Sequence, residues 1–306
     1  MNIVSLDIGG TKIHSAKITE DGKIMREFNI KTDAFKGRRI VLEKISSQIK
    51  QLLDKDTRAI GIGIPGQVDL KNGRVLNLIN IPGFKDIALK KDLENEFRLP
   101  VALQNDAKCF AIGERKFGAH GKKYENFVGM TIGTGIGCGI IIDGKIYSGK
   151  DNFAGEFGHT ILKVDGPDCN CGKKGCFEQF ASGSGIEKRA IEMLRAANLK
   201  TALKEDEITT KKIFQEALKG DEFAKKVVEE SAYFLGLGIS NIITALNPEA
   251  IILGGSVSKS FGQMEKITLE TIRENTFQPA GQTPVLVSTL ENPALFGAAA
   301  LAMELM

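Results

Sequence analysis

The feature that most constrains the fold of this chain is a strand, glycine turn and second strand that occurs twice, about 124 residues apart. The first copy passes from residues 2–7 through a Gly-Gly-Thr turn into residues 12–19. The second passes from residues 126–132 through a Gly-Thr-Gly turn, and both copies close at an Asp-Gly turn. This repeat predicts two related α/β halves, each opening with a hairpin. The alternative is a chance likeness between two glycine-rich hairpins.

Helical periodicity and short apolar runs fill the rest of the chain. Helices are predicted over residues 39–53, 107–114, 184–198, 221–245 and 294–305. Buried strands are predicted over residues 59–64, 100–104 and 250–253. This alternation is typical of an α/β protein.

Composition excludes several classes of protein. The 306 residues correspond to about two domains, and 41 basic against 38 acidic side chains leave a net charge of +3. So small a charge does not indicate a nucleic-acid surface. No apolar run approaches the roughly 18 residues of a membrane span, and the N-terminus lacks the features of a secretory signal. We therefore expect a cytoplasmic protein that binds neither nucleic acid nor membrane.

The two glycine turns are suited to hold phosphate groups, because amides without a neighbouring Cβ can converge on them. The residues assigned to them are Asp7, Gly9, Gly10, Thr11 and Lys12 in the first turn, and Gly133, Thr134, Gly135 and Gly137 in the second. The carboxylate of Asp7 could hold Mg²⁺ beside a transferred phosphoryl group. Taken singly, each turn is more often structural than functional.

Two other phosphate motifs are disfavoured. Residues 144–150 have P-loop spacing, but Asp151 follows where a magnesium-binding hydroxyl is required. No strand leads into a Gly-x-Gly-x-x-Gly turn, which argues against a dinucleotide dehydrogenase.

Three of the five cysteines form a cluster within eight residues, and a histidine lies ten residues upstream. The four residues are His159, Cys169, Cys171 and Cys176. Three thiolates and one imidazole complete a tetrahedral zinc shell, and a filled shell is structural. Free thiols or a redox pair are the alternatives, but Gly172 and Gly175 let the chain curl so that three sulfurs meet. Cys109 and Cys138 are expected in the core.

Polar residues near this cluster and at a strand end are candidates for chemistry. Glu156 and Glu178 bracket the cysteines and could accept hydrogen bonds from a polyhydroxyl ligand, although such a glutamate, read singly, is more often a solvated surface charge. Asn105 and Asp106 stand where a strand meets a helix. Asp106 could be a general base there, or only the N-cap of the helix.

Together these segments resemble the ROK family of sugar kinases, within the actin, Hsp70 and hexokinase-like superfamily. The most specific likeness is Gly-Glu-Phe-Gly-His at residues 155–159, followed by Cys-x-Cys-Gly-x-x-Gly-Cys-x-Glu at residues 169–178. The resemblance implies two ribonuclease-H-like (actin/hexokinase-type) α/β domains with a cleft between them. Residues 1–114 with 293–306 would form the small domain, and residues 115–292 the larger domain that carries the zinc.

The resemblance also implies a role for each site residue. Asp106 would take the proton from a sugar hydroxyl. The sugar-binding residues would be Gly66, Asn105, Asp106, Glu156, His159 and Glu178. The two glycine turns would hold the phosphates of ATP with Mg²⁺, and the turn beneath the adenosine would be Gly254, Gly255 and Ser256. The zinc would be structural.

We therefore expect an ATP-dependent hexose kinase of carbohydrate metabolism and glycolysis, with glucose phosphorylated at its 6-hydroxyl. An N-acetylglucosamine or N-acetylmannosamine kinase is the alternative, followed by a fructokinase. A sugar-sensing regulator and a zinc-dependent hydrolase are hypotheses from other classes. The chain starts directly at the first strand, which argues against a repressor with an N-terminal winged helix. A homodimer is expected by family analogy alone.

Overall fold

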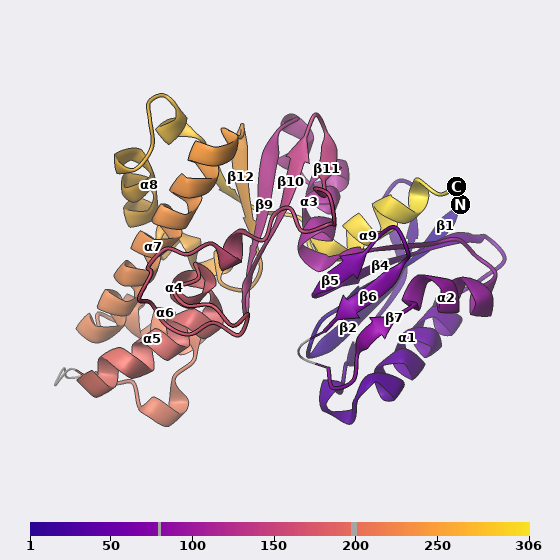
Figure 1. Ribbon diagram of the computed structural model, residues 1–306, viewed down its shortest axis with the longest axis horizontal. Coiled ribbons are helices and arrows are strands. Elements are labelled where there is room, and N and C mark those ends of the chain that lie inside the picture. The colour runs from indigo at the N-terminus through magenta and orange to yellow at the C-terminus, as the bar shows by residue number, and fades with distance from the viewer. Residues whose placement is uncertain (79–80, 197–200) are drawn as a thin grey trace. The chain divides into compact units, whose positions relative to one another are not determined.

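The computed structural model describes residues 1–78, 81–196 and 201–306. The strands are β1 Asn2–Ile8, β2 Lys12–Thr19, β3 Ile24–Lys31, β4 Thr57–Ile64, β5 Gln67–Asp69, β6 Arg74–Asn77, β7 Lys85–Ile87, β8 Val101–Asn105, β9 Phe127–Ile132, β10 Ile136–Ile142, β11 Lys145–Tyr147, β12 Ala250–Gly254 and β13 Val285–Val287. The helices are α1 Arg38–Leu52, α2 Leu89–Phe97, α3 Asp106–Phe117, α4 Glu178–Ala181, α5 Gly183–Ala196, α6 Thr210–Leu218, α7 Glu222–Leu246, α8 Glu265–Glu274 and α9 Pro293–Met303 (Figure 1).

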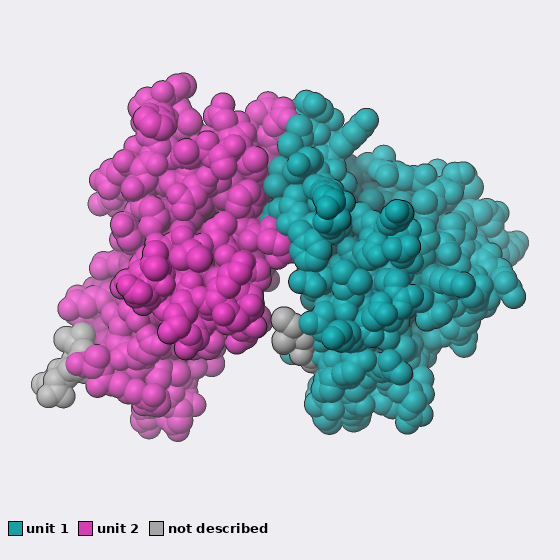
Figure 2. All heavy atoms as spheres, viewed as in Figure 1, with its two compact units in different colours: residues 1–125, 139–155, 289–306 teal, residues 126–138, 156–288 magenta. Residues whose placement is uncertain are grey.

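The chain forms two compact units (Figure 2). Unit 1 comprises Met1–Glu125, Gly139–Gly155 and Thr289–Met306, and unit 2 comprises Asn126–Cys138 and Glu156–Ser288. Unit 1 thus holds residues 115–125, 139–155 and 289–292 besides the segments expected for the small domain. The predicted domain boundaries stay a prediction.

A five-stranded sheet in the order β3-β2-β1-β4-β8 forms the centre of unit 1. The hairpin strands β1, β2 and β3 are antiparallel, whereas β1, β4 and β8 are parallel. The apolar face of α1 is buried on one side of this sheet, with Val41, Ile45 and Ile49 in the same core as the strands. On the other side α9 packs Leu295 and Ala299 into a second core. A small sheet, β5-β6-β7, belongs to the same unit.

The second large sheet has the order β11-β10-β9-β12-β13. Its strand β12 is parallel to both β9 and β13, as β4 is to β1 and β8. In both sheets, therefore, the hairpin strands come first and two later parallel strands extend the sheet. This shared topology confirms the two related halves predicted from the repeated glycine hairpins.

Most predicted elements are present with small shifts at their ends. The hairpins, α1, β4, α3, β12 and α9 lie where periodicity placed them. α5 ends at Ala196 among the described residues, and the predicted end of this helix at residue 198 lies outside them. None of the described helices is long and apolar enough to span a membrane.

Candidate functional site

The parallel strands of unit 1 bring its predicted site residues to one edge of the sheet. Asp7 lies opposite Gly63 near the end of β1, and Ile64 lies opposite Asn105 at the end of β8. Because the strands are parallel, the turns that follow β1, β4 and β8 leave the sheet at the same edge. Ligands of α/β proteins bind at this carboxyl edge.

The junction of β8 and α3 shows which residue caps the helix. The N-cap of α3 is Asn105, whose Oδ1 accepts the backbone N–H groups of Ala107 at 3.0 Å and Lys108 at 3.2 Å. Asp106 is the first residue of the helix, and its Oδ1 accepts the Ala107 N–H at 2.8 Å. The N-cap alternative for Asp106 is therefore wrong, since the neighbouring asparagine already supplies the cap.

Gly66 and Asn105 are in direct contact. The side-chain Nδ2 of Asn105 donates to the Gly66 carbonyl at 3.1 Å. Gly66 has a φ of +85°, and a Cβ at this position would lie 2.5 Å from the Asn77 carbonyl oxygen. Only glycine fits there, for both conformational and steric reasons. Three predicted sugar-binding residues, Gly66, Asn105 and Asp106, thus lie together.

The two aspartates of this edge interact electrostatically. Burial, with a smaller contribution from the Asp106 carboxylate, raises the pKa of the Asp7 carboxyl from its ordinary 3.8 to about 7. Burial also raises the pKa of the Cys109 thiol, with both aspartates contributing. Such an environment favours a cation beside the carboxylates, and an oxygen donor is what Mg²⁺ prefers. Asp7 therefore fits the magnesium role predicted for it.

The first glycine turn is held by backbone bonds and by a residue that sequence reasoning missed. Gly9 N–H donates to the Lys12 carbonyl at 2.8 Å, which closes the turn. Thr32, which is fully buried, donates its hydroxyl to the Gly9 carbonyl at 2.7 Å and its N–H to the Thr11 carbonyl at 2.9 Å. Its signal was weak, because a threonine at a strand end has many possible roles.

In unit 2 the second glycine turn and the Gly254 turn leave one sheet edge. Gly254 lies opposite Thr131 in the parallel pair of β12 and β9. Gly255 has a φ of +89°, and a Cβ there would lie 2.4 Å from the Ile132 carbonyl oxygen. Gly133 accepts the Gly183 N–H at 2.7 Å, so the start of α5 supports the turn. The predicted phosphate and adenosine turns of this unit are therefore neighbours.

The four predicted zinc ligands lie together in unit 2. The ligand atoms of His159, Cys169, Cys171 and Cys176 are all within 4.8 Å of one another. Cys171 Sγ lies 3.6 Å from Cys176 Sγ, and Cys169 Sγ lies 3.7 Å from His159 Nδ1. Zn–S bonds of about 2.3 Å at tetrahedral angles separate two sulfurs by about 3.8 Å, whereas a disulfide needs about 2.05 Å. The donor set and its spacing fit zinc.

Backbone bonds fold the cysteine loop around this site. The N–H of Cys169 donates to the Lys173 carbonyl at 2.8 Å, and Gly175 N–H donates to the Pro167 carbonyl at 2.8 Å. Gly175 has a φ of +66°, and a Cβ there would lie 1.6 Å from the Lys163 carbonyl oxygen. The predicted role of the loop glycines is thereby confirmed for Gly175.

Glu178 joins the zinc cluster to the second glycine turn. Its Oε1 lies 3.2 Å from Cys169 Sγ and 3.7 Å from His159 Nδ1, and its Oε2 accepts the Ile136 N–H at 3.4 Å. The Glu178 side chain is only 15% exposed, so it is no ordinary surface charge. Glu156 is exposed, and its Oε2 lies 4.0 Å from His159 Nε2. The two ring nitrogens of His159 therefore face different groups.

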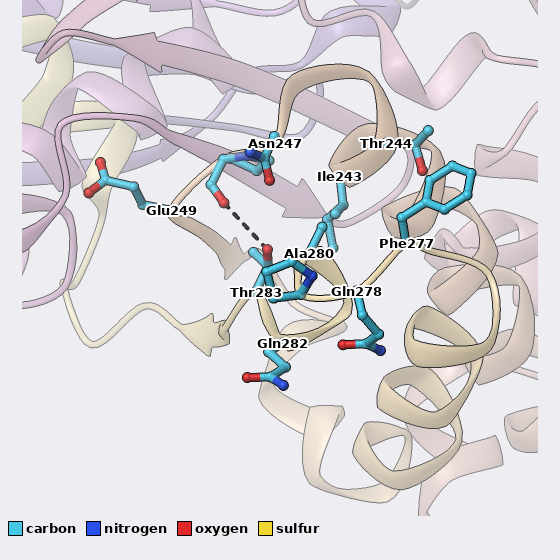
Figure 3. Close-up of a pocket in the computed structure, with 11 residues that line it drawn as sticks. Ile243, Thr244, Asn247, Glu249, Phe277, Gln278, Ala280, Gln282 and Thr283 are labelled. Carbon is cyan, nitrogen blue, oxygen red and sulfur yellow. Dashed lines mark hydrogen bonds between the residues drawn. The ribbon is translucent and has the colours of Figure 1, made fainter.

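A cavity of about 480 Å³ lies elsewhere in unit 2. It is lined by the end of α7, residues 247–249 and residues 277–283, where Pro248 accepts from the Thr283 hydroxyl (Figure 3). Its lining holds no glycine turn and none of the predicted site residues. We therefore place candidate site residues at the sheet edge of each unit, taken separately: the carboxylates and first glycine turn in unit 1, and the second glycine turn and Gly254 turn in unit 2.

Two related sheets that deliver glycine turns and carboxylates to their strand ends define an α/β protein of the actin and hexokinase-like class. The chain belongs to the ROK family, whose profile matches residues 3–304.

Individual relatives agree with this membership. A glucokinase from Halalkalibacterium halodurans is 39% identical over 268 residues, covering 84% of this chain and 81% of that protein. The crystal structure of a ROK family glucokinase from Streptomyces griseus in complex with glucose and AMPPNP has a TM-score of 0.86 and 32% identity, and covers 99% of this chain and 100% of that one. A putative N-acetylmannosamine kinase from Listeria monocytogenes has a TM-score of 0.84 and 25% identity, with both chains fully covered.

Proposed function

We propose that this protein is an ATP-dependent sugar kinase that phosphorylates glucose at its 6-hydroxyl. The observation that carries the proposal is the sheet edge of unit 1, where Asp106 follows Asn105 and Asn105 bonds to Gly66. At the same edge, burial and the charge of Asp106 raise the pKa of the Asp7 carboxyl. The similarity to glucokinases supports the choice of sugar.

Asp106 is the proposed general base. Its carboxylate takes the proton of the sugar 6-hydroxyl while that oxygen forms a bond to the γ-phosphorus of ATP. The bond from the γ-phosphorus to the bridging oxygen breaks, and ADP leaves with that electron pair. Phosphoryl transfer asks the protein mainly for alignment and charge neutralisation, so one well-placed base is sufficient.

The remaining residues bind and orient the two substrates. We assign the sugar hydroxyls to Gly66, Asn105, Glu156, His159 and Glu178. The phosphates of ATP are assigned to the two glycine turns, and the adenosine to the turn formed by Gly254, Gly255 and Ser256. Asp7 would hold Mg²⁺, which supplies neutralisation of the phosphate charge when bound.

The zinc site is assigned a structural role. Three thiolates and one imidazole fill a tetrahedral shell, which leaves no open position for an attacking water. This argues against the zinc-dependent hydrolase. A metal bound by His159 would fix the orientation of its ring and, through the contact of Nδ1 with Glu178, of that carboxylate. Both are proposed sugar-binding residues.

An assay of sugar-phosphate formation tests the substrate, because this product is common to every phosphoryl donor. Glucose, mannose, fructose and the N-acetylhexosamines are each offered with ATP, ADP or polyphosphate as donor. We expect the highest kcat/KM for glucose with ATP. A higher value for N-acetylglucosamine or N-acetylmannosamine would overturn the choice of glucose but not the kinase. Discrimination is expected in residues 66–82, of which residues 79–80 lie outside those that the structure describes.

The variant Asp106→Asn tests the base. We expect kcat to fall by about 10²- to 10⁴-fold while glucose binding, measured by calorimetry, persists. The exposed Asp92→Asn on α2 is the control and keeps full turnover. If the protein is a sugar-sensing regulator instead, Asp106→Asn should change nothing measurable.

The proposed homodimer, which rests on family analogy, is checked by light scattering on the purified protein.

A further inference from the structure

A buried hydrogen-bond network lies behind the junction of β8 and α3, within unit 1. Its side chains are those of Gln104, Lys108 and Asn152, which are 2%, 1% and 8% exposed. A lysine is almost never fully buried unless its ammonium group is paired. The oxygens that accept hydrogen bonds from Lys108 are therefore needed to keep this charge inside the protein. None of the three belongs to the sugar, phosphate or zinc residues described above.

Asn152 occupies the centre of the network. Its Oδ1 accepts from Lys108 Nζ at 2.8 Å, and its main-chain carbonyl accepts from the same ammonium group. Its Nδ2 donates to Gln104 Oε1 at 2.9 Å and to the Val68 carbonyl at 3.1 Å. Gln104 Oε1 also accepts the N–H of Asn105 at 2.8 Å.

The direction of every bond in this network is fixed by its ends. Lys108 can only donate, so Asn152 must present its oxygen to it. The Val68 carbonyl can only accept and the Asn105 N–H can only donate, which settles both the Asn152 and Gln104 amides. A hydrogen-bond network with one allowed arrangement also fixes the backbone segments bonded to it, here β8, α3 and β5.

These attachments enclose the catalytic dipeptide. Gln104 precedes Asn105 and Asp106 in the chain, Lys108 follows them, and Asn152 bonds to both flanking side chains. We propose that Lys108 and Asn152 form a clasp whose function is to position Asp106 for proton abstraction. They are positioning residues, since they act through β8 and α3. The inference rests on the proposed kinase function and deepens it.

The clasp has a second attachment on the sugar side. Val68 lies in β5, two residues beyond Gly66, whose carbonyl receives Asn105 Nδ2. Asn152 therefore bonds directly to the base side through Gln104 and to the Gly66 side through Val68, whereas Lys108 lies on α3 itself and reaches the Gly66 side through Asn152. The two residues should differ in their kinetic effects for this reason.

Two variants separate these effects. Lys108→Met removes the ammonium group at similar length. Asn152→Gly removes the amide without strain, because Asn152 has a φ of +65°, and it keeps the main-chain acceptor of Lys108. The control is Lys44→Met, because Lys44 also donates to a backbone carbonyl, that of Lys31, and to a side-chain oxygen, that of Asp33.

We expect Lys108→Met to lower kcat by about 10- to 100-fold, the loss typical of a displaced reacting group, with the glucose KM within about threefold of the parent. Asn152→Gly should lower kcat and also raise the glucose KM. Lys44→Met should change neither. Hydrogen exchange at residues 104–108 should rise in the first two variants only, which measures the clasp without any turnover.

Three results would overturn the inference. They are an unchanged kcat in both variants, a rise in KM alone in Lys108→Met, and faster exchange at residues 104–108 with full activity, which would make the network merely structural. If Lys108→Met does not fold, Asn152→Gly alone still decides. A parent protein that phosphorylates no sugar refutes the proposed function instead, and the exchange measurement tells the two failures apart.

Discussion

Two residues at the sheet edge of unit 1 stand out by their charge state or backbone conformation. Asp7 keeps a carboxylate where burial opposes its ionisation, and Gly66 occupies a backbone region closed to other residues. Carboxyl groups with a raised pKa, and backbone positions that only glycine can occupy, are both frequent at functional sites. Both stand at the sheet edge of unit 1 where the phosphoryl transfer is proposed.

Asp7→Asn should stabilise the protein without magnesium or nucleotide at pH 8. Well below pH 3.8 the carboxyl is protonated in both folded and unfolded chains, so Asp7 has no effect. Between the unfolded pKa of 3.8 and the folded pKa of about 7, the unfolded chain ionises Asp7 while the folded chain keeps it protonated, so stability is lost across this range. The loss is complete above pH 7 and amounts to about 4 kcal/mol.

Urea unfolding at several pH values measures this effect. The advantage of Asp7→Asn over the parent should shrink towards pH 4. A pH-independent difference would contradict the raised pKa of Asp7.

Gly66→Ala should destabilise unit 1 and raise the KM for the sugar. The added Cβ combines a φ of +85° with a 2.5 Å approach to the Asn77 carbonyl oxygen. Gly83→Ala is the matched control, because its φ is +72° but nothing lies within 4 Å of the Cβ. Gly83→Ala should lower the free energy of unfolding by only about 1 kcal/mol, because alanine is disfavoured in the left-handed conformation. It should leave the KM unchanged. Equal losses in thermal unfolding would show that the close approach does not matter.

At the scale of elements, the close contact of α3 with α9 shapes unit 1. A Cβ on Gly297 of α9 would lie 1.7 Å from the Cys109 carbonyl oxygen, and one on Gly113 of α3 would lie 2.0 Å from the Pro293 carbonyl oxygen. The two helix backbones therefore touch, with glycine on each side. Because α3 begins at Asp106, the contact with α9 helps to fix the helix that carries the proposed base.

Gly297→Ala should lower the free energy of unfolding by more than about 2 kcal/mol, since overpacking at a backbone contact outweighs the gain in helix propensity. Gly262→Ala, in the short helix Ser258–Gln263, has open space around its Cβ and should be neutral or slightly stabilising. Urea titrations compare the two variants. A stabilised Gly297→Ala would mean that α9 moves away from α3 without loss.

The elements that sequence could predict are those with a long or repeated pattern. The hairpins, α1 and α7 carry enough apolar residues to show their period, and the four zinc ligands are close enough in sequence for spacing to group them. The strands β5, β6 and β7 have three or four residues each and no readable period. The contact of Glu178 with the Ile136 N–H joins residues 42 apart in sequence, which only tertiary structure can bring together.

At the scale of the whole molecule, the two units have separate sources of stability. Unit 1 contains two apolar cores around its sheet. Unit 2 contains the cysteine cluster, whose ligand atoms lie within 4.8 Å of one another. A structural metal contributes directly to folding, so its loss should act on the unit that contains it.

Cys171→Ser should lower the zinc content from about one ion per chain and lower the thermal stability of unit 2. Hydrogen exchange should rise at residues 156–178 and leave β1, β4 and β8 unchanged. Cys138→Ser, at a buried cysteine outside the cluster, should keep its zinc. Zinc content is measured with a chromogenic chelator after denaturation. Full zinc occupancy in Cys171→Ser would contradict the ligand assignment.

The clasp of Lys108 and Asn152 also limits how this chain can evolve. Each bond has one allowed direction, so an exchange of Lys108 alone leaves the oxygens of Asn152 without their donor, and an exchange of Asn152 alone leaves a buried ammonium group short of an acceptor. Single exchanges at either position should therefore be selected against. Among descendants of this sequence, positions 108 and 152 should be inherited as a pair and change together.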